Sequence, residues 1–418
     1  MLLRRVVLLA APMMMLLFTA ELFASGPGGI VSNNNQSAEW VRTLNRYAST
    51  DVDAVFFNPA GTAKLAGGTH IGFSNQTFFK YYNFKDDNPV LSRNEHNSYV
   101  ISPVFPNLHV AHKKENMACM FGFDIMTGGG AGTHEDGLPF TDFMGIVLGG
   151  GDDVKSEFTG YFVGAGFSVG AAYAVNDVLS VAGQVRYIYT LGGNEAKITP
   201  VLNGVAQSTE ELDMSLSGDC YGFVIGANIT PMEELNIGMR YSYYTKLELE
   251  QEINDGKDLY GQFAEREGQK ADNTIPQDFA LGVSYHMTQR LRVETSFIFY
   301  YNEGTDWSDE RGDHIENGWE AGVGLEYAVI PDKLLASIGY LYSKKGLPDE
   351  LQSDMSAKID AFTYGLGATY FFKPTLDVTF SYLYSGDDEV VNNEGPIGST
   401  QRLKSNTQTF CLGFNVRF

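Results

Sequence analysis

The chain has 418 residues, of which 44% are hydrophobic and 19% charged, and its formal net charge is −22. So acidic a chain repels nucleic acids and anionic membrane surfaces, and we expect neither as a partner. Its three cysteines, Cys119, Cys220 and Cys411, match no metal-binding or redox spacing, so the sequence predicts no cofactor, no metal site and no obligatory disulfide.

Residues 1–25 have the layout of a cleaved secretory signal. Arg4 and Arg5 precede an apolar run over 6–18, and small residues follow at 24–26. The run is shorter than the roughly 20 apolar residues that a membrane-spanning helix needs. No later segment predicts such a helix, so a form of this protein within a membrane has to be a closed β-barrel.

Residues 26–68 predict a small N-terminal domain instead of strands. Apolar side chains recur at helical spacing between Trp40 and Tyr47. The apolar tract 55–57 then runs into residues 58–61, which form a turn by their composition.

Residues 69–418 predict a β-barrel, because apolar and polar residues alternate in stretches close to the roughly 9 to 11 residues of a tilted membrane strand. An even number of strands suits a barrel with both ends on the periplasmic side. The fourteen predicted strands are 69–84, 98–112, 117–126, 155–173, 179–191, 212–229, 235–246, 277–286, 291–301, 318–328, 334–343, 360–371, 376–385 and 406–418.

The connections between these strands support the barrel. Those after even-numbered strands are tight, as over 174–178 and 371–375, whereas those after odd-numbered strands are long and polar, as over 127–154 and 248–275. Short periplasmic turns that alternate with long extracellular loops are typical of outer-membrane barrels.

Charge placement predicts which face of each strand meets lipid. Val185 and Phe297 belong to apolar faces, whereas Arg186 and Arg240 lie on the opposite, charged faces. Arginine or lysine facing lipid costs about 2 to 4 kcal/mol near the bilayer midplane, so the charged faces are expected to line the lumen. By the same alternation Cys220 and Cys411 face the lumen and Cys119 faces lipid.

The last nine residues alternate strictly and end on the aromatic Phe418. This pattern predicts the closing strand and resembles the signal that the outer-membrane barrel assembly machinery recognises. The sequence therefore predicts an all-β fold, a fourteen-stranded antiparallel transmembrane barrel in the outer membrane of a Gram-negative bacterium. We expect a monomer in contact with lipid and lipopolysaccharide. Because fourteen strands enclose more space than side chains fill, residues 26–68 are predicted to form a hatch inside the lumen of the barrel 69–418.

The tract 53–61, followed by Leu65, resembles the NPA hatch motif of the FadL/TodX family of outer-membrane transporters. Residues 106–109 and 121–123 are similar to the family's second strand and its inwardly kinked third strand. The resemblance implies passive uptake of long-chain fatty acids or other hydrophobic small molecules, with lateral diffusion through an opening at the kink. It assigns the hatch motif to Phe57, Asn58, Pro59 and Ala60, and the lateral-opening strand to Gly122, Phe123 and Gly128.

The third connection is unusually apolar for an exposed loop, and exposed apolar patches commonly mark binding sites. It therefore predicts a groove that captures hydrophobic ligand. The alternative is that the stretch folds down as a local plug or a short helix on the barrel rim. The candidate residues are Leu138, Phe140, Phe143, Met144, Ile146 and Leu148.

Two luminal arginines, Arg186 and Arg240, are candidates to bind a carboxylate head group through paired hydrogen bonds. Pairing with a luminal acid such as Glu320 is at least as probable an interpretation. No catalytic motif is present, so we expect no enzymatic activity. The alternatives to a transporter of hydrophobic molecules are a general diffusion porin and a structural or adhesive surface barrel.

Overall fold

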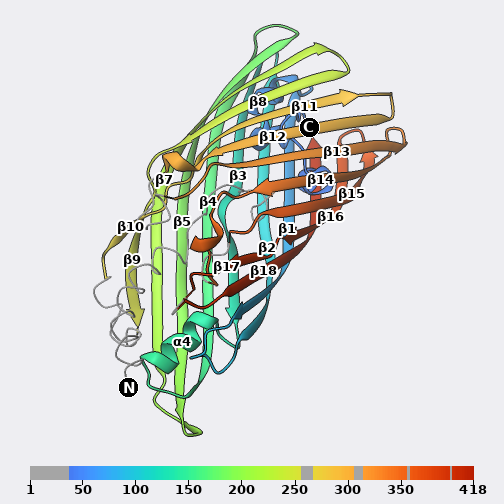
Figure 1. Ribbon diagram of the computed structural model, residues 1–418. Helices are drawn as coiled ribbons and strands as arrows, with labels where there is room; N and C mark the ends of the chain where they lie inside the picture. Colours follow the sequence, from blue (N-terminus) through green and yellow to red (C-terminus); the bar gives the residue numbers. More distant parts are fainter. Residues whose placement is uncertain (1–36, 256–266, 306–313, 355–357, 396–397) are drawn as a thin grey trace.

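The computed structural model describes residues 37–418, except 256–266, 306–313, 355–357 and 396–397 (Figure 1). Fourteen antiparallel strands form a closed barrel in the described part of the chain, as predicted. The sheet closes because β1 (Gly68–Asp86) pairs with β18 (Gln401–Arg417) along its whole length, from His70 opposite Arg417 to Asp86 opposite Gln401.

Between β1 and β18 the wall follows chain order. Its other strands are β2 (Glu95–Lys114), β3 (Met117–His134), β4 (Asp153–Ala174), β5 (Leu179–Leu202), β7 (Glu210–Met232), β8 (Leu235–Tyr244), β11 (Gln277–His286), β12 (Leu291–Tyr301), β13 (Gly318–Ile330), β14 (Leu334–Lys344), β15 (Ala361–Lys373) and β16 (Leu376–Asp387). Four short strands, β6 (Val205–Ala206), β9 (Glu248–Asp255), β10 (Lys270–Asp272) and β17 (Val390–Asn392), extend the sheet within the long connections.

The two ends of the barrel differ. One end carries the tight turns and the C-terminus, and the other carries the long connections and helix α4 (Pro139–Val147), at the lower end of Figure 1. We call them the short-turn end and the long-loop end. At the long-loop end β5 continues to Leu202, eleven residues beyond the predicted 191, because pairing with β4 and β7 satisfies its backbone there.

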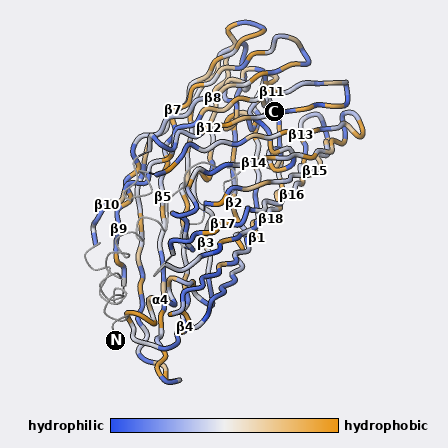
Figure 2. The backbone as a smooth tube through the Cα atoms, viewed as in Figure 1, coloured by the Kyte–Doolittle hydropathy of each residue, from blue (hydrophilic) through white to orange (hydrophobic). Residues whose placement is uncertain are grey.

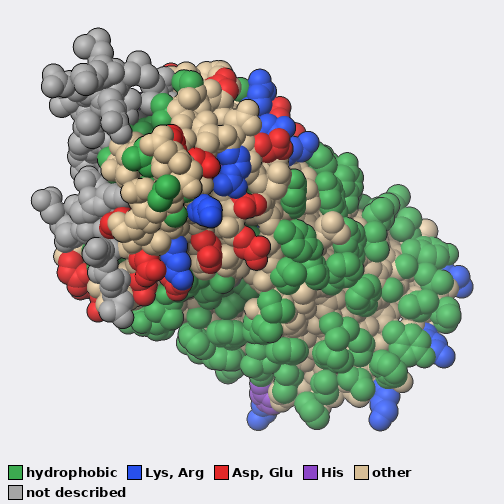
Figure 3. All heavy atoms as spheres, turned by 90° about the horizontal axis from the view of Figure 1, so that it is seen from below, with side chains coloured by type: hydrophobic (Ala, Val, Ile, Leu, Met, Phe, Trp, Pro, Cys, Tyr) green, Lys and Arg blue, Asp and Glu red, His purple; other side chains and the backbone are tan. Residues whose placement is uncertain are grey.

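The wall is apolar outside and polar inside. Val185 and Phe297 are exposed, whereas Arg186 and Glu294 are buried. Figure 2 shows the alternation along the strands. Figure 3 shows hydrophobic side chains covering the wall, with acidic side chains gathered near the long-loop end and basic ones at both ends. No helix in the described residues is long and apolar enough to cross a membrane.

The cysteines follow the same division. Cys119 is exposed, and Cys220 and Cys411 are buried, as the alternation predicted. All three are free thiols among the residues described.

The N-terminal segment lies inside the ring of strands. Its elements are α2 (Ala38–Thr43), α3 (Ala54–Phe57) and the 3₁₀ helix η3 (Pro59–Lys64). Helix α2 contacts β13 to β16, β18 and β1, and η3 contacts β2 to β5, β7 and β8, so together they touch the wall on all sides. The predicted signal and residues 26–36 lie outside the described range, and a role for this segment as a hatch remains a prediction.

Small residues on the wall make room for this segment. A Cβ atom at Gly238 would lie 2.1 Å from the Tyr47 carbonyl oxygen, and one at Gly339 would lie 2.1 Å from that of Thr43. Real Cβ atoms do not approach so closely, so the backbone of the segment fits only because these strands carry glycine there.

Candidate functional site

The apolar third connection is folded into the barrel mouth. It forms helix α4, which packs against β4 and β5. Leu138 and Met144 are each 1% exposed, Phe143 is buried, and Phe140, Ile146 and Leu148 are half-buried. Of the two interpretations from the sequence, the short helix at the rim is what forms, with most of these side chains turned inward, and a role of this connection in ligand capture stays a prediction. The physical reason is the hydrophobic effect: packing against the barrel interior removes the apolar surface of these side chains from water, whereas an exposed loop would leave it hydrated.

Polar contacts hold α4 in place. The Asp142 carboxylate accepts from the Ser156 hydroxyl at 2.6 Å and lies 2.9 Å from His96 Nε2, and both partners come from the barrel wall. At the start of α4, the Phe140 backbone N–H donates to Asp354 Oδ2 at 2.8 Å. The helix is thus fixed from three sides by hydrogen bonds to carboxylates.

The contact between α4 and Asp354 predicts a dependence on pH. Burial raises the pKa of Asp354 from 3.8 to about 6, the Asp86 charge adds to this, and the Phe140 N–H and His96 oppose it. Because ionisation is harder in the docked state, docking is strongest below pH 4 and weakens as the pH rises through 6, by on the order of 3 kcal/mol.

The measurement is hydrogen exchange of the α4 amides, corrected for intrinsic rates, at pH 5 and pH 7.5. Greater protection at pH 5 is expected. The Asp354→Asn variant should flatten this difference, and an unchanged pH dependence in that variant would assign it to another group, such as His96.

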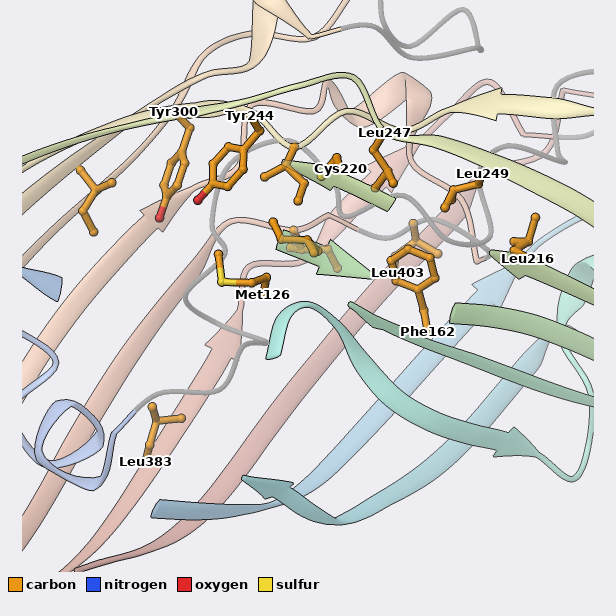
Figure 4. Packing of buried hydrophobic residues seen from close by; sticks show 14 of the residues in the cluster. Met126, Phe162, Leu216, Cys220, Tyr244, Leu247, Leu249, Tyr300, Leu383 and Leu403 are labelled. Atoms are coloured by element: carbon orange, nitrogen blue, oxygen red, sulfur yellow. The ribbon is translucent and has the colours of Figure 1, made fainter. Parts of the chain in front are cut away.

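An apolar interior connects α4 to the N-terminal segment. Buried side chains from facing strands form one cluster that includes Met144 of α4, Phe162, Ile188, Tyr300 and Phe56 of α3. Figure 4 shows several of these side chains entering a shared interior from different strands. Contacts with these side chains would replace water around a hydrophobic molecule.

The two predicted arginines both point inward and meet the N-terminal segment, yet their partners differ. Arg240 donates to Asp278 at 2.6 Å and to the Phe56 carbonyl oxygen at 2.9 Å. Arg186, 2% exposed, donates to the Tyr244 hydroxyl oxygen at 3.0 Å, and its guanidinium lies 5.0 Å from the centre of the Phe56 ring. Among the residues that the structure describes, no carboxylate forms an ion pair with Arg186.

Arg240 thus forms an ion pair with a luminal acid, as the alternative interpretation from the sequence had it, but the acid is Asp278 and not Glu320. Glu320, the acid considered from the sequence, accepts from the hydroxyls of Tyr300 at 3.0 Å and Ser343 at 2.8 Å. Alternation along the strands placed Arg240 and Glu320 in the lumen, but it carried no information on which luminal groups meet.

The NPA residues are anchored to the wall. Asn58 Nδ2 donates to Asn228 Oδ1 at 2.7 Å and to the Ser49 carbonyl oxygen at 2.9 Å. The Ala60 carbonyl accepts from the Ser180 hydroxyl at 2.8 Å. Pro59 opens η3, and Phe57 is buried against Tyr47, with ring centres 5.5 Å apart. These contacts fix the turn against β5 and β7.

The wall has one interruption in its backbone pairing among the described strands. β2 pairs with β3 only over 108–114 and 117–123. Toward the long-loop end, the remainder of each strand, 95–107 of β2 and 124–134 of β3, is not paired with the other. We call this region the wall window. Apart from Gly130, both stretches are fully described, so the interruption is a feature of the strands themselves.

The window arises from a displacement of β3. Its register against β4 shifts twice, between Ile125 and Thr127 and again between Thr127 and Gly130. Gly128 between these positions has a φ of +89°, and a Cβ atom there would lie 2.0 Å from the Phe162 carbonyl oxygen. Only glycine fits such a bulge, so Gly128 is required for the kink.

Side chains from both borders fill the window. Phe105 of β2 and Ile125 of β3 are buried together with Phe78 of β1, and the two phenylalanine rings lie 5.0 Å apart. Pro103 and Pro106 of β2 have no N–H to donate to a strand ladder. In this state the window is closed by apolar side chains and by the hydrogen bond from the Ser102 hydroxyl to the Gly129 carbonyl oxygen at 3.2 Å, and not by a backbone ladder.

The predicted lateral-opening residues lie on both sides of the kink. Gly122 and Phe123 belong to the last paired positions of β3, opposite His109 and Leu108, and Gly128 lies within the bulge. Sequence reasoning missed Phe105 and Ile125. The prolines and glycines nearby were the available signal, because they interrupt pairing.

The comparisons with known proteins decide the family. Residues 23–418 match the model of the family described as outer membrane protein transport protein (OMPP1/FadL/TodX). The chain belongs to this family. The family consists of transport channels of bacterial outer membranes, and not of enzymes. No curated protein sequence matches the chain.

Solved structures of the same fold include family members. A Pseudomonas aeruginosa FadL homologue is 16% identical, with a TM-score of 0.69 over 94% of this chain and 100% of that one. The toluene transporter TodX of P. putida is 12% identical, with a TM-score of 0.62 over 88% and 94% of the two chains. TbuX, a toluene transporter of Ralstonia pickettii, is 12% identical, with a TM-score of 0.56 over 88% and 94%. At such identities the likeness shows the fold alone.

Proposed function

We propose that this protein takes up small hydrophobic molecules through the outer membrane by passive diffusion. Ligand is captured by the α4 connection, crosses the apolar interior and leaves sideways through the wall window into the membrane. The protein acts as a monomer surrounded by lipid and lipopolysaccharide, and Phe418 directs its assembly. Residues 26–68 act as a hatch that blocks the straight path to the short-turn end.

The observation that carries this proposal is the wall window beside an apolar interior. A gap in the ladder between two neighbouring strands is costly in lipid, where water cannot supply the missing hydrogen bonds. A porin would need no such feature, since its solutes pass along the axis. The continuous apolar cluster from Met144 to Phe56 suits a hydrophobic solute and opposes a hydrated ion.

Uptake by cells tests the function. Bacteria that produce the full chain are compared with cells carrying an empty vector, using labelled decanoic acid, toluene and a small sugar. Faster uptake of a hydrophobic solute without faster uptake of the sugar is expected. Uptake of all three solutes would instead indicate a general porin, and no change in any of them would contradict transport.

Arg186 is proposed as the anchor for a carboxylate head group, because it is a buried cation without an ion-pair partner among the described residues. The Arg186→Met variant is expected to bind decanoate about tenfold more weakly, since a hydrogen bond to a charged group contributes about 1.5 to 3 kcal/mol. Toluene binding should not change.

Arg402→Met is the matched control, because Arg402 is exposed at the long-loop end. Arg186 also contacts Phe56 of the N-terminal segment. Bilayer conductance of Arg186→Met is therefore measured as a second control, and a low value shows that the segment is still in place. Equal weakening of decanoate and toluene would contradict a head-group role.

A further inference from the structure

Several polar side chains on the inner wall have a buried atom without a hydrogen-bond partner among the described residues, and three of them lie on β3 and β5 beside the strand bulge or further along β5. The atoms concerned are the hydroxyl of Thr127, the hydroxyl of Thr190, and both polar atoms of the Asn194 amide. These residues are 3%, 0% and 1% exposed, respectively. Native proteins rarely leave buried polar atoms unsatisfied, so each such atom calls for a physical explanation.

The two hydroxyl side chains flank one glycine. Gly164 of β4 is the register partner of Thr127 on β3 and of Thr190 on β5. A Cβ atom at Gly164 would lie 2.3 Å from Thr127 Cγ2 and 3.2 Å from Thr190 Oγ1. The Thr127 side chain therefore occupies the place that a side chain at position 164 would take, and glycine there lets Thr127 and Thr190 both lie against β4, on the inner side of the strand bulge that forms the wall window.

Asn194 repeats this arrangement toward the long-loop end. It follows Thr190 by four residues on the same face of β5, which places it about 13 Å further along the strand. Its Oδ1 lies 3.2 Å from the Cβ position of Gly160, again a glycine of β4. At two positions along the barrel wall, a polar side chain of β5 therefore lies next to a glycine of β4.

The surroundings of these groups are apolar and uncharged. Ile188 Cγ2 lies 3.6 Å from the Cβ position of Gly164, and the Phe158 ring lies 3.4 Å from that of Gly160. Hydroxyl and amide groups both donate and accept hydrogen bonds, so they complement a neutral partner that does the same. A charged ligand group would find no countercharge in these contacts.

We propose that Thr127 and Thr190 form a subsite for a neutral hydrogen-bonding group, a hydroxyl or a carbonyl, of a hydrophobic solute on its way to the wall window. Asn194 offers the same chemistry earlier on the path. This inference rests on the proposed function and deepens it, because it assigns a preference for solutes such as long-chain alcohols over plain hydrocarbons. Binding satisfies protein atoms that otherwise remain unpaired, at no cost of desolvating a charge.

The test compares decanol with decane, which differ only in the hydroxyl. Dissociation constants are measured with the purified full chain in detergent micelles, by competition against a fluorescent hydrophobic probe. Partition into micelles cancels when the same solute is compared between wild type and variant. Thr190→Val, which keeps the side-chain shape, is expected to weaken decanol binding about threefold to tenfold and to leave decane binding unchanged.

Two further variants sharpen the result. Gly164→Ala places a methyl group 2.3 Å from Thr127 Cγ2 and should also weaken decanol binding, because it displaces that side chain. Thr133→Val is the matched control, because the Thr133 hydroxyl is exposed and meets only that of Thr159, at 3.0 Å, on the outer side. It should change neither solute.

Unchanged decanol affinity in Thr190→Val and Gly164→Ala would overturn the subsite, because water would then be the partner of these hydroxyls. Equal loss for decanol and decane would overturn it as well, since that result indicates a change of shape. Binding of neither solute by the wild type would overturn the proposed function itself, which separates the two failures.

Discussion

A disulfide between β2 and β3 across the wall window is expected to reduce uptake of hydrophobic solutes by about tenfold, if lateral exit gates transport. The Cβ position of Gly132 lies 3.6 Å from Val100 Cβ, close to the roughly 3.8 Å that disulfides favour. The pair Val100→Cys and Gly132→Cys should therefore cross-link without strain. The bond would prevent the two borders from separating at the long-loop end of the window.

The cross-link is made in a Cys119→Ser background, because Cys119 is the exposed thiol among the native cysteines described. Uptake is measured before and after reduction, and recovery on reduction serves as the internal control. Phe105→Ala is the opposing variant, since it removes a side chain that fills the window and should raise the uptake rate. Full uptake by the oxidised double variant would contradict lateral exit at this place.

Loss of the Asp53 carboxylate is expected to unseat the N-terminal segment and to raise ion conductance. Asp53 accepts two hydrogen bonds from the Arg46 guanidinium, at 2.8 and 2.9 Å, and both residues are buried. Burial alone would raise the pKa of Asp53, but Arg46 and the Ser49 hydroxyl lower it to about 2. The carboxylate is therefore charged at every physiological pH.

Asp53→Asn leaves the Arg46 charge buried without its main partner, which costs about 3 to 5 kcal/mol. Single-channel conductance in planar bilayers and the thermal unfolding midpoint are the measurements. Arg46→Met combined with Asp53→Leu is the matched control, because an apolar pair of similar volume removes both charges and should restore much of the loss. A closed channel in Asp53→Asn would contradict a plugging role for this pair.

The sequence alone determined the barrel. A strand in a bilayer must present apolar residues to lipid at every second position, so the alternation from residue 69 onward identified the strands and their facing. Tight turns and long connections alternate along the chain, and this alternation predicted which end of the barrel carries the turns and which carries the long loops. The buried Arg186 and the exposed Val185 follow from that single constraint.

The tertiary structure decided which groups meet and how the long connections fold. Alternation places Arg186, Arg240 and Thr190 in the lumen, but their partners come from strands far away in the chain, and register across several strands sets those distances. The apolar stretch 138–148 carried no periodic signal that distinguished an exposed groove from a buried helix. Its packing became favourable only because the mouth of the closed barrel offered apolar surface and three carboxylate hydrogen bonds.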